Sequence, residues 1–177
     1  SEFRDIEIKN AYRDFVGGGI LDEETMLKFV NAIGRDNARF PMHWDDSDNA
    51  GFTTGTPWIS VNENYKKINA AAQVNDPDSI FSYYKKLIEL RHQMEIIVYG
   101  VYKSKAIEHP DVFAYTRTLG DEKLFVVCNF REQEMDFTLE DGFTGDEKVL
   151  ISNYDDVVKT ENGIYLRPYE AKVFYRK

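Results

Sequence analysis

The feature that most constrains the fold is a change of pattern near Val98. From there on, short runs rich in β-branched and aromatic residues alternate with turn signals such as Gly120-Asp121 and Asn162-Gly163. Because no helical period separates these runs, they predict an antiparallel sheet, folded as a sandwich of roughly 80 residues. The expected strands are 98–107, 112–119, 123–130, 134–139, 148–153, 163–167 and 171–175.

The region before this switch has a helical period. Two helices are expected within residues 5–33, separated by Gly17-Gly18-Gly19. The second has Asp22 as its N-cap and Gly34 as its C-cap. Its apolar face consists of Met26, Phe29, Val30 and Ile33.

A further helix is predicted to start at Asp76, with Pro77 in its first position. Its apolar stripe consists of Ile80, Phe81, Tyr84, Leu87, Ile88 and Arg91. Residues 35–75 lack any period but contain five aromatic residues, which predicts an ordered surface loop pinned by those side chains. The chain therefore divides into residues 1–95, helices plus a long loop, and residues 96–177, the β-sandwich; the fold class is α+β.

Charge and composition exclude several classes of function. The 22 Lys and Arg against 31 Asp and Glu give a net charge of −9, so neither nucleic acid nor a membrane surface is expected as a partner. A single cysteine, Cys128, rules out an intrachain disulfide and a multi-cysteine zinc site. His43, His92 and His109 lack the short spacing of a metal-binding helix. We therefore expect no metal, no cofactor and a cytoplasmic location.

The run Asp45-Asp46-Ser47-Asp48-Asn49-Ala50-Gly51 invites comparison with a calcium loop. An EF-hand needs Gly at the sixth position and Glu at the twelfth, where this chain has Ala50 and Thr56. The EF-hand reading therefore fails. A calcium loop of another kind and a solvated Asx turn both remain open.

The segment Arg35-Asp36-Asn37-Ala38-Arg39 places two guanidinium groups and a carboxylate just after a helix end. Arg and Asp present fixed hydrogen-bonding forks that can clamp the hydroxyls of a polyol. Trp44, Phe52 and Trp58 follow and could stack on sugar rings. Alternatively, the Arg–Asp pair only ties the loop to the helix.

Six stretches stand out as a set: 34–45, 49–53, 55–58, 61–65, 82–91 and 98–100. The first reads Gly34-Arg35-Asp36-Asn37-Ala38-Arg39-Phe40-Pro41-Met42-His43-Trp44-Asp45. With the opening Arg4-Asp5-Ile6-Glu7, they resemble glycoside hydrolase family 13, in its branch of oligo-1,6-glucosidases and α-glucosidases. The resemblance covers residues 4–130 well and the later strands more loosely.

The resemblance implies a layout for the chain. Family members have a (β/α)₈ barrel followed by a C-terminal antiparallel β-sandwich. The chain is expected to begin after the eighth barrel strand, as a processed or truncated C-terminal fragment. The rest of the barrel is then its natural partner, and helices that normally face the barrel would expose apolar stripes. Dimerisation through those helices, or partial disorder before Ile80, is expected for the isolated chain.

The resemblance also implies a function. Members are retaining glycosidases, whose nucleophile and acid/base are carboxylates. The family's three catalytic carboxylates lie upstream of Arg4, so no catalytic residue is expected here and the fragment should be inactive alone. Arg39 matches the family Arg that binds glucose in subsite −1, with Arg35 and Asp36 in support.

The expected parent is a retaining α-glucosidase acting on short α-glucosides such as isomalto-oligosaccharides. Sucrose isomerase and trehalose-6-phosphate hydrolase are alternatives within the branch. The choice stays open because Phe40 and His43 stand where the family usually has Thr and Gln. A stand-alone sugar-binding or structural β-sandwich is the alternative outside the family.

Overall fold

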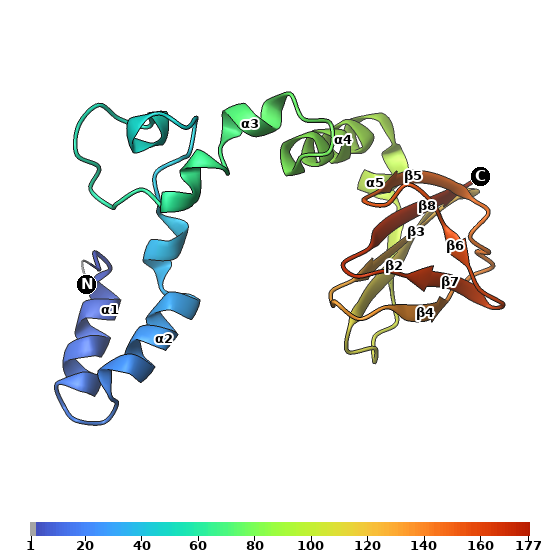
Figure 1. Ribbon diagram of the computed structural model, residues 1–177. Coiled ribbons are helices and arrows are strands. Elements are labelled where there is room, and N and C mark those ends of the chain that lie inside the picture. The colour runs from blue at the N-terminus through green and yellow to red at the C-terminus, as the bar shows by residue number, and fades with distance from the viewer. Residues whose placement is uncertain (1–2) are drawn as a thin grey trace. The chain divides into compact units, whose positions relative to one another are not determined.

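The computed structural model describes residues 3–177 (Figure 1). The chain divides into two compact units, one up to Tyr83 and one from Tyr84 to Lys177. The domain boundary expected between residues 95 and 96 falls within the short helix α5 (Glu95–Tyr99) and stays a prediction. Within the described residues, no helix is both long and apolar enough to cross a membrane.

The first unit opens with a pair of helices. Helix α1 (Ile6–Ala11) runs into a π-helical turn (Tyr12–Val16), and α2 (Glu23–Ile33) follows after the glycine run. The predicted N-cap is confirmed, since the Asp22 carboxylate accepts the Thr25 N–H at 2.8 Å. The small core of this pair consists of the buried residues Ile8, Met26 and Val30. Of the predicted apolar face of α2, Phe29 and Ile33 are exposed.

The long segment after α2 is mostly irregular, as predicted, but it contains a helix that the sequence pattern missed. Helix α3 (Ala70–Val74) begins at Asn69, whose side chain accepts the Ala72 N–H at 2.9 Å. Three 3₁₀ turns precede it: Arg35–Ala38, Asp48–Gly51 and Glu63–Lys66. A helix of one turn leaves too short a period to detect in sequence.

The expectation that aromatic side chains pin this loop is wrong for Trp44, Phe52 and Trp58, which are exposed. Backbone hydrogen bonds hold the loop instead. The Ala70 N–H donates to the His43 carbonyl at 2.9 Å, and the Ala71 N–H donates to the Trp44 carbonyl at 2.9 Å. The ends of the loop are therefore joined by main-chain groups, which carry no residue-specific signal.

The acidic run at 45–51 forms an Asx turn. The Asp45 carboxylate accepts the Ser47 N–H at 2.9 Å, and Asn49 and Ala50 have φ values of 53° and 57°. Glycine is required at position 51, because Gly51 has a φ of +66° and an added Cβ would lie 2.7 Å from the Asp45 carboxylate. The local turn explains the composition of the run. Among residues 3–177, no three His, Cys, Asp or Glu are grouped to hold a metal ion.

Helix α4 (Ile80–Gln93) begins later than predicted. The Ser79 hydroxyl accepts the Ser82 N–H at 3.2 Å and so takes the capping role expected of Asp76. The Asp76 carboxylate accepts the Asp78 N–H at 2.9 Å in the preceding turn. The predicted apolar stripe exists, but within this structure it is unpartnered: Ile80, Phe81, Tyr84, Leu87 and Ile88 are all exposed.

The strand expected at 98–107 is wrong at its start. Residues 95–99 form α5, which ends at Gly100, and the strand begins only at Val101. The β-branched residues of this stretch favour a strand by propensity. Burial overrides that preference, because Ile96 is fully buried where α5 packs on β2 (Val112–Leu119) and β3 (Glu122–Asn129).

The rest of the second unit is a two-sheet sandwich of antiparallel strands (Figure 1). One sheet has the order β1-β2-β3-β8-β5 and the other β4-β7-β6. The remaining strands are β1 (Val101–Lys105), β4 (Met135–Thr138), β5 (Lys148–Ser152), β6 (Val158–Lys159), β7 (Gly163–Leu166) and β8 (Ala171–Arg176). The α+β expectation is confirmed; among the described strands, the two-residue strand β6 was missed.

The core of the sandwich lies between the two sheets. Phe125 and Phe174 from one sheet and Ile164 from the other have no exposed surface. The Phe125 ring lies 5.3 Å from the Phe143 ring, centroid to centroid. Side chains alternate between the two faces of β2, so Phe113 lies on the outer face and is 46% exposed. The buried phenylalanines therefore serve packing, whereas Tyr102, Phe130 and Tyr169 are exposed like Phe113.

Candidate functional site

The three residues expected to bind substrate come together at the end of α2. Arg35 and Asp36 belong to the 3₁₀ turn that follows Gly34, and Arg39 comes directly after that turn. A fourth residue, Asp5, joins them from the start of α1. The site is thus built from two segments about 30 positions apart in the chain.

Asp36 ties these two segments together through the main chain. Its Oδ2 accepts the N–H of Arg4 at 2.7 Å and the N–H of Asp5 at 3.0 Å. Its Oδ1 lies 3.4 Å from Nη1 of Arg39. Because the Asp5 N–H, then the Arg4 N–H, stabilise the ionised form, the pKa of the Asp36 carboxyl is lowered.

Asp5 is the site residue that sequence reasoning missed. Its side chain is only 2% exposed. Oδ1 accepts the Glu7 N–H at 2.8 Å and so caps α1, while Oδ2 accepts from Nε of Arg35 at 2.9 Å. The Glu7 N–H, followed by Arg35, lowers the pKa of the Asp5 carboxyl. The available signal was an Asp placed directly before a helix.

Arg35 and Arg39 play different parts in this cluster. Arg35 donates to Asp5 through Nε, and its Nη2 lies 2.6 Å from the Glu7 carboxylate. Asp5 is the main cause of the raised pKa of Arg35. Its guanidinium is therefore engaged by carboxylates on two edges. The geometry suits an interaction that fastens α1 to the turn after α2.

Arg39 keeps most of its hydrogen-bonding capacity. Only its Nη1 faces the cluster, 3.5 Å from Asp5 Oδ2 and 3.4 Å from Asp36 Oδ1. Within residues 3–177, Nε and Nη2 have no protein partner, and the side chain is 39% exposed. These two groups can donate hydrogen bonds to adjacent hydroxyl or carboxylate oxygens of a ligand.

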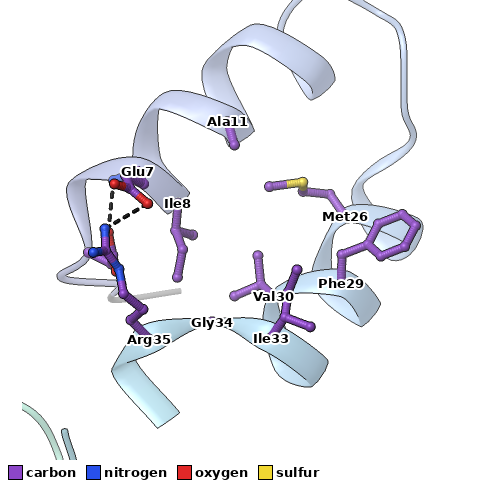
Figure 2. A pocket seen from close by; sticks show the side chains of 10 residues that line it. Glu7, Ile8, Ala11, Met26, Phe29, Val30, Ile33, Gly34 and Arg35 are labelled. Atoms are coloured by element: carbon purple, nitrogen blue, oxygen red, sulfur yellow. Dashed lines mark hydrogen bonds and ion pairs between the residues drawn. The ribbon is translucent and has the colours of Figure 1, made fainter. Parts of the chain in front are cut away.

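A shallow pocket of about 200 Å³ lies next to the cluster (Figure 2). Apolar side chains of α1 and α2 line it, and Arg35 and Glu7 lie together at one end. A sugar needs hydrogen-bonding groups around its hydroxyls, and this lining offers them only at that end. The pocket is better described as an unpacked face of the helix pair than as a sugar site.

Two sequence families match the chain in succession. Residues 12–100 match the family described as alpha amylase, catalytic domain. Residues 112–173 match the alpha-amylase SusG C-terminal domain. The order of the matches follows the order of the structure, with helices and loop first and the sandwich second.

Curated relatives cover nearly the whole chain. An oligo-1,6-glucosidase of Parageobacillus thermoglucosidasius is 50% identical over 175 residues, 98% of this chain and 31% of that protein. The oligo-1,6-glucosidase of Bacillus cereus is 50% identical over 181 residues, 99% of this chain and 32% of that protein. The chain therefore spans about a third of the length of these relatives.

Solved structures also match nearly the whole chain. The isomaltulose synthase of Protaminobacter rubrum superposes with a TM-score of 0.91 at 43% identity, over 98% of this chain and 31% of that one. The trehalose-6-phosphate hydrolase of Bacillus licheniformis superposes with a TM-score of 0.89 at 42% identity, over 98% and 32%.

Proposed function

The chain belongs to the alpha-amylase family, glycoside hydrolase family 13, in its oligo-1,6-glucosidase branch, and on this premise we propose that it is the C-terminal third of a retaining α-glucosidase. The whole enzyme would hydrolyse short α-glucosides such as isomalto-oligosaccharides. The observation that carries the proposal is the 50% identity to oligo-1,6-glucosidases over nearly all of this chain.

In this proposal Arg39 is the substrate-binding residue. Its free Nε and Nη2 would donate to the hydroxyls of a terminal glucose, while Asp36 and Arg35 hold the turn on which it lies. A fork of donors aimed at the end of a sugar chain favours attack on chain ends. The exposed Trp44 and Trp58 are available to stack on further sugar rings.

The chemistry itself would come from elsewhere in the enzyme. Retaining glycosidases use two carboxylates, a nucleophile and an acid/base, which the family carries in barrel strands upstream of the matching third. Asp5 and Asp36 are unsuited to either role, because arginines and backbone N–H groups already occupy them. We therefore expect the purified chain to be inactive alone.

A chimera tests this proposal. The matching third of the Bacillus cereus oligo-1,6-glucosidase is replaced by this chain, and isomaltose hydrolysis is measured as glucose release. The expected result is activity in the chimera and none in the relative truncated at the same junction. A folded chimera that releases no glucose from isomaltose would contradict the proposal.

The unpartnered stripe of α4 predicts the behaviour of the isolated chain. The barrel would cover this stripe in the whole enzyme, so the purified chain is expected to self-associate. Leu87→Lys with Ile88→Lys should shift it to monomer in sedimentation velocity. Lys85→Glu with Lys86→Glu, on the polar face, is the matched control and should leave self-association in place. A wild-type chain that is monomeric at all concentrations would contradict this prediction.

Two further proposals concern the substrate and the cellular location. Trehalose-6-phosphate hydrolase activity is the second candidate, because the Bacillus subtilis enzyme of that name is 42% identical over 98% of this chain. We also propose a cytoplasmic location, which agrees with a single cysteine, Cys128, that can form no intrachain disulfide.

A further inference from the structure

We infer that Asp5 is a positioning residue, which holds the guanidinium of Arg39 in the orientation needed to bind the terminal sugar. This inference rests on the proposed function and adds to it a residue from a different segment of the chain. Asp5 itself contacts no substrate. It acts through its contact with Arg39 and through its bond to Arg35, which fastens α1 to the turn before Arg39.

The Asp5 carboxylate is fixed before Arg39 approaches it. Oδ1 is bound by the Glu7 N–H, and Oδ2 by Nε of Arg35, at 2.8 and 2.9 Å. The backbone of Asp5 is fixed as well, because its own N–H donates to Asp36. A side chain that is 98% buried, with both carboxylate oxygens bound and its own backbone N–H held, cannot follow a moving partner.

Arg39 is held between two such carboxylates. Its Nη1 lies 3.5 Å from Asp5 and 3.4 Å from Asp36, at the long end of hydrogen bonding. No parallel pair of short N–H···O bonds fixes the guanidinium plane to either acid. Its position therefore depends on attraction to both negative charges, and loss of one should let it swing toward the other.

This arrangement anchors Arg39 at one edge and leaves the opposite edge free. Nη1 meets the two acids, while Nε and Nη2 have no partner among the described residues. A side chain with many rotamers loses less entropy on binding if it is already anchored. Asp5 thus reduces the conformational entropy that Arg39 loses when the sugar binds.

Glu7 offers a matched comparison. It also pairs with Arg35, at 2.6 Å from Nη2, but it is exposed and does not contact Arg39. Removing the charge of Glu7 therefore disturbs Arg35 alone, whereas removing the charge of Asp5 disturbs Arg35 and Arg39 together. Asn at position 5 keeps an oxygen for the helix cap, so Asp5→Asn removes charge without removing the cap.

The kinetic test compares Asp5→Asn with Glu7→Gln in the chimera. Asp5→Asn is expected to lower kcat/KM for isomaltose about tenfold, mainly through a higher KM, because loss of one charge-assisted contact loosens Arg39. Glu7→Gln is expected to change kcat/KM by less than about twofold. Equal effects of the two substitutions would overturn the inference. If Asp5→Asn fails to fold, Asp5→Ser, which also caps helices, takes its place.

A second measurement separates this inference from the proposed function. In the purified chain, the Nε–H resonance of Arg39 is followed by nuclear magnetic resonance. Asp5→Asn is expected to lower its order parameter, and Glu7→Gln to leave it unchanged. That readout needs no enzyme activity, so an inactive chimera would refute the proposed function without deciding the role of Asp5. An order parameter unaffected by Asp5→Asn would overturn the inference.

Discussion

Arg39→Ala in the chimera is expected to lower kcat/KM for isomaltose about 100-fold, because a positioned donor fork on the sugar is lost. Arg39 is the one arginine of the cluster whose Nε and Nη2 are not engaged by carboxylates of the described residues. Arg39→Lys should recover little, since an ammonium is a point charge and cannot present two donors in one plane. Initial rates over a range of isomaltose concentrations provide the measurement.

Arg13→Ala is the control for Arg39. Arg13 lies in the same unit, is 71% exposed and, among residues 3–177, pairs only with its neighbour Asp14. Its loss should leave kcat/KM unchanged, because exposed pairs of this kind contribute little. If Arg39→Ala remained within twofold of the unsubstituted chimera, Arg39 would serve only to tie the loop to the helix.

The second large effect is expected in the sandwich. Phe125→Ala should lower the free energy of unfolding of the second unit by about 3–5 kcal/mol, the usual cost of deleting a fully buried ring. Phe125 has no exposed surface and packs against Phe137 and Phe143. Phe113→Ala, on the outer face, is the matched control and should cost less than about 1 kcal/mol.

Urea unfolding, monitored separately in the two units, provides the measurement. Both tryptophans, Trp44 and Trp58, lie in the first unit, so fluorescence reports on that unit. Hydrogen exchange at the amides of β3 reports on the sandwich. Phe125→Ala is expected to shift the second signal more than the first. Equal sensitivity of β3 to Phe125→Ala and Phe113→Ala would contradict the assignment of the core.

Local sequence signals predicted most strands and most helices, and they failed where packing or main-chain bonds decide. The alternation around Phe113 and Ala114 gave β2 its correct bounds, and the Asp22 cap placed the start of α2. The strand expected from Val98 overlapped the end of α5, because β-branched side chains in this stretch favour strand. Burial of Ile96 against the sheet makes residues 95–99 a helix, and that burial depends on strands much later in the chain.

Part of the candidate site was likewise predictable from local sequence and part was not. Arg35, Asp36 and Arg39 were predictable as a group because a short segment carries all three. Asp5 was not, because its contacts with Arg35 and Arg39 join residues 30 and 34 positions apart. Spacing along the chain gives no measure of such a distance. The distinction between Arg35, which is engaged, and Arg39, which is open, likewise needed coordinates.

We propose that this chain supplies a sugar-binding arginine to an α-glucosidase but not its catalytic carboxylates. Isomaltose hydrolysis by the purified chain, assayed beside the chimera at equal concentration, tests it most directly. We expect glucose release by the chimera and none by the chain alone. Turnover by the chain that persists through further purification would mean that the catalytic carboxylates lie within these 177 residues.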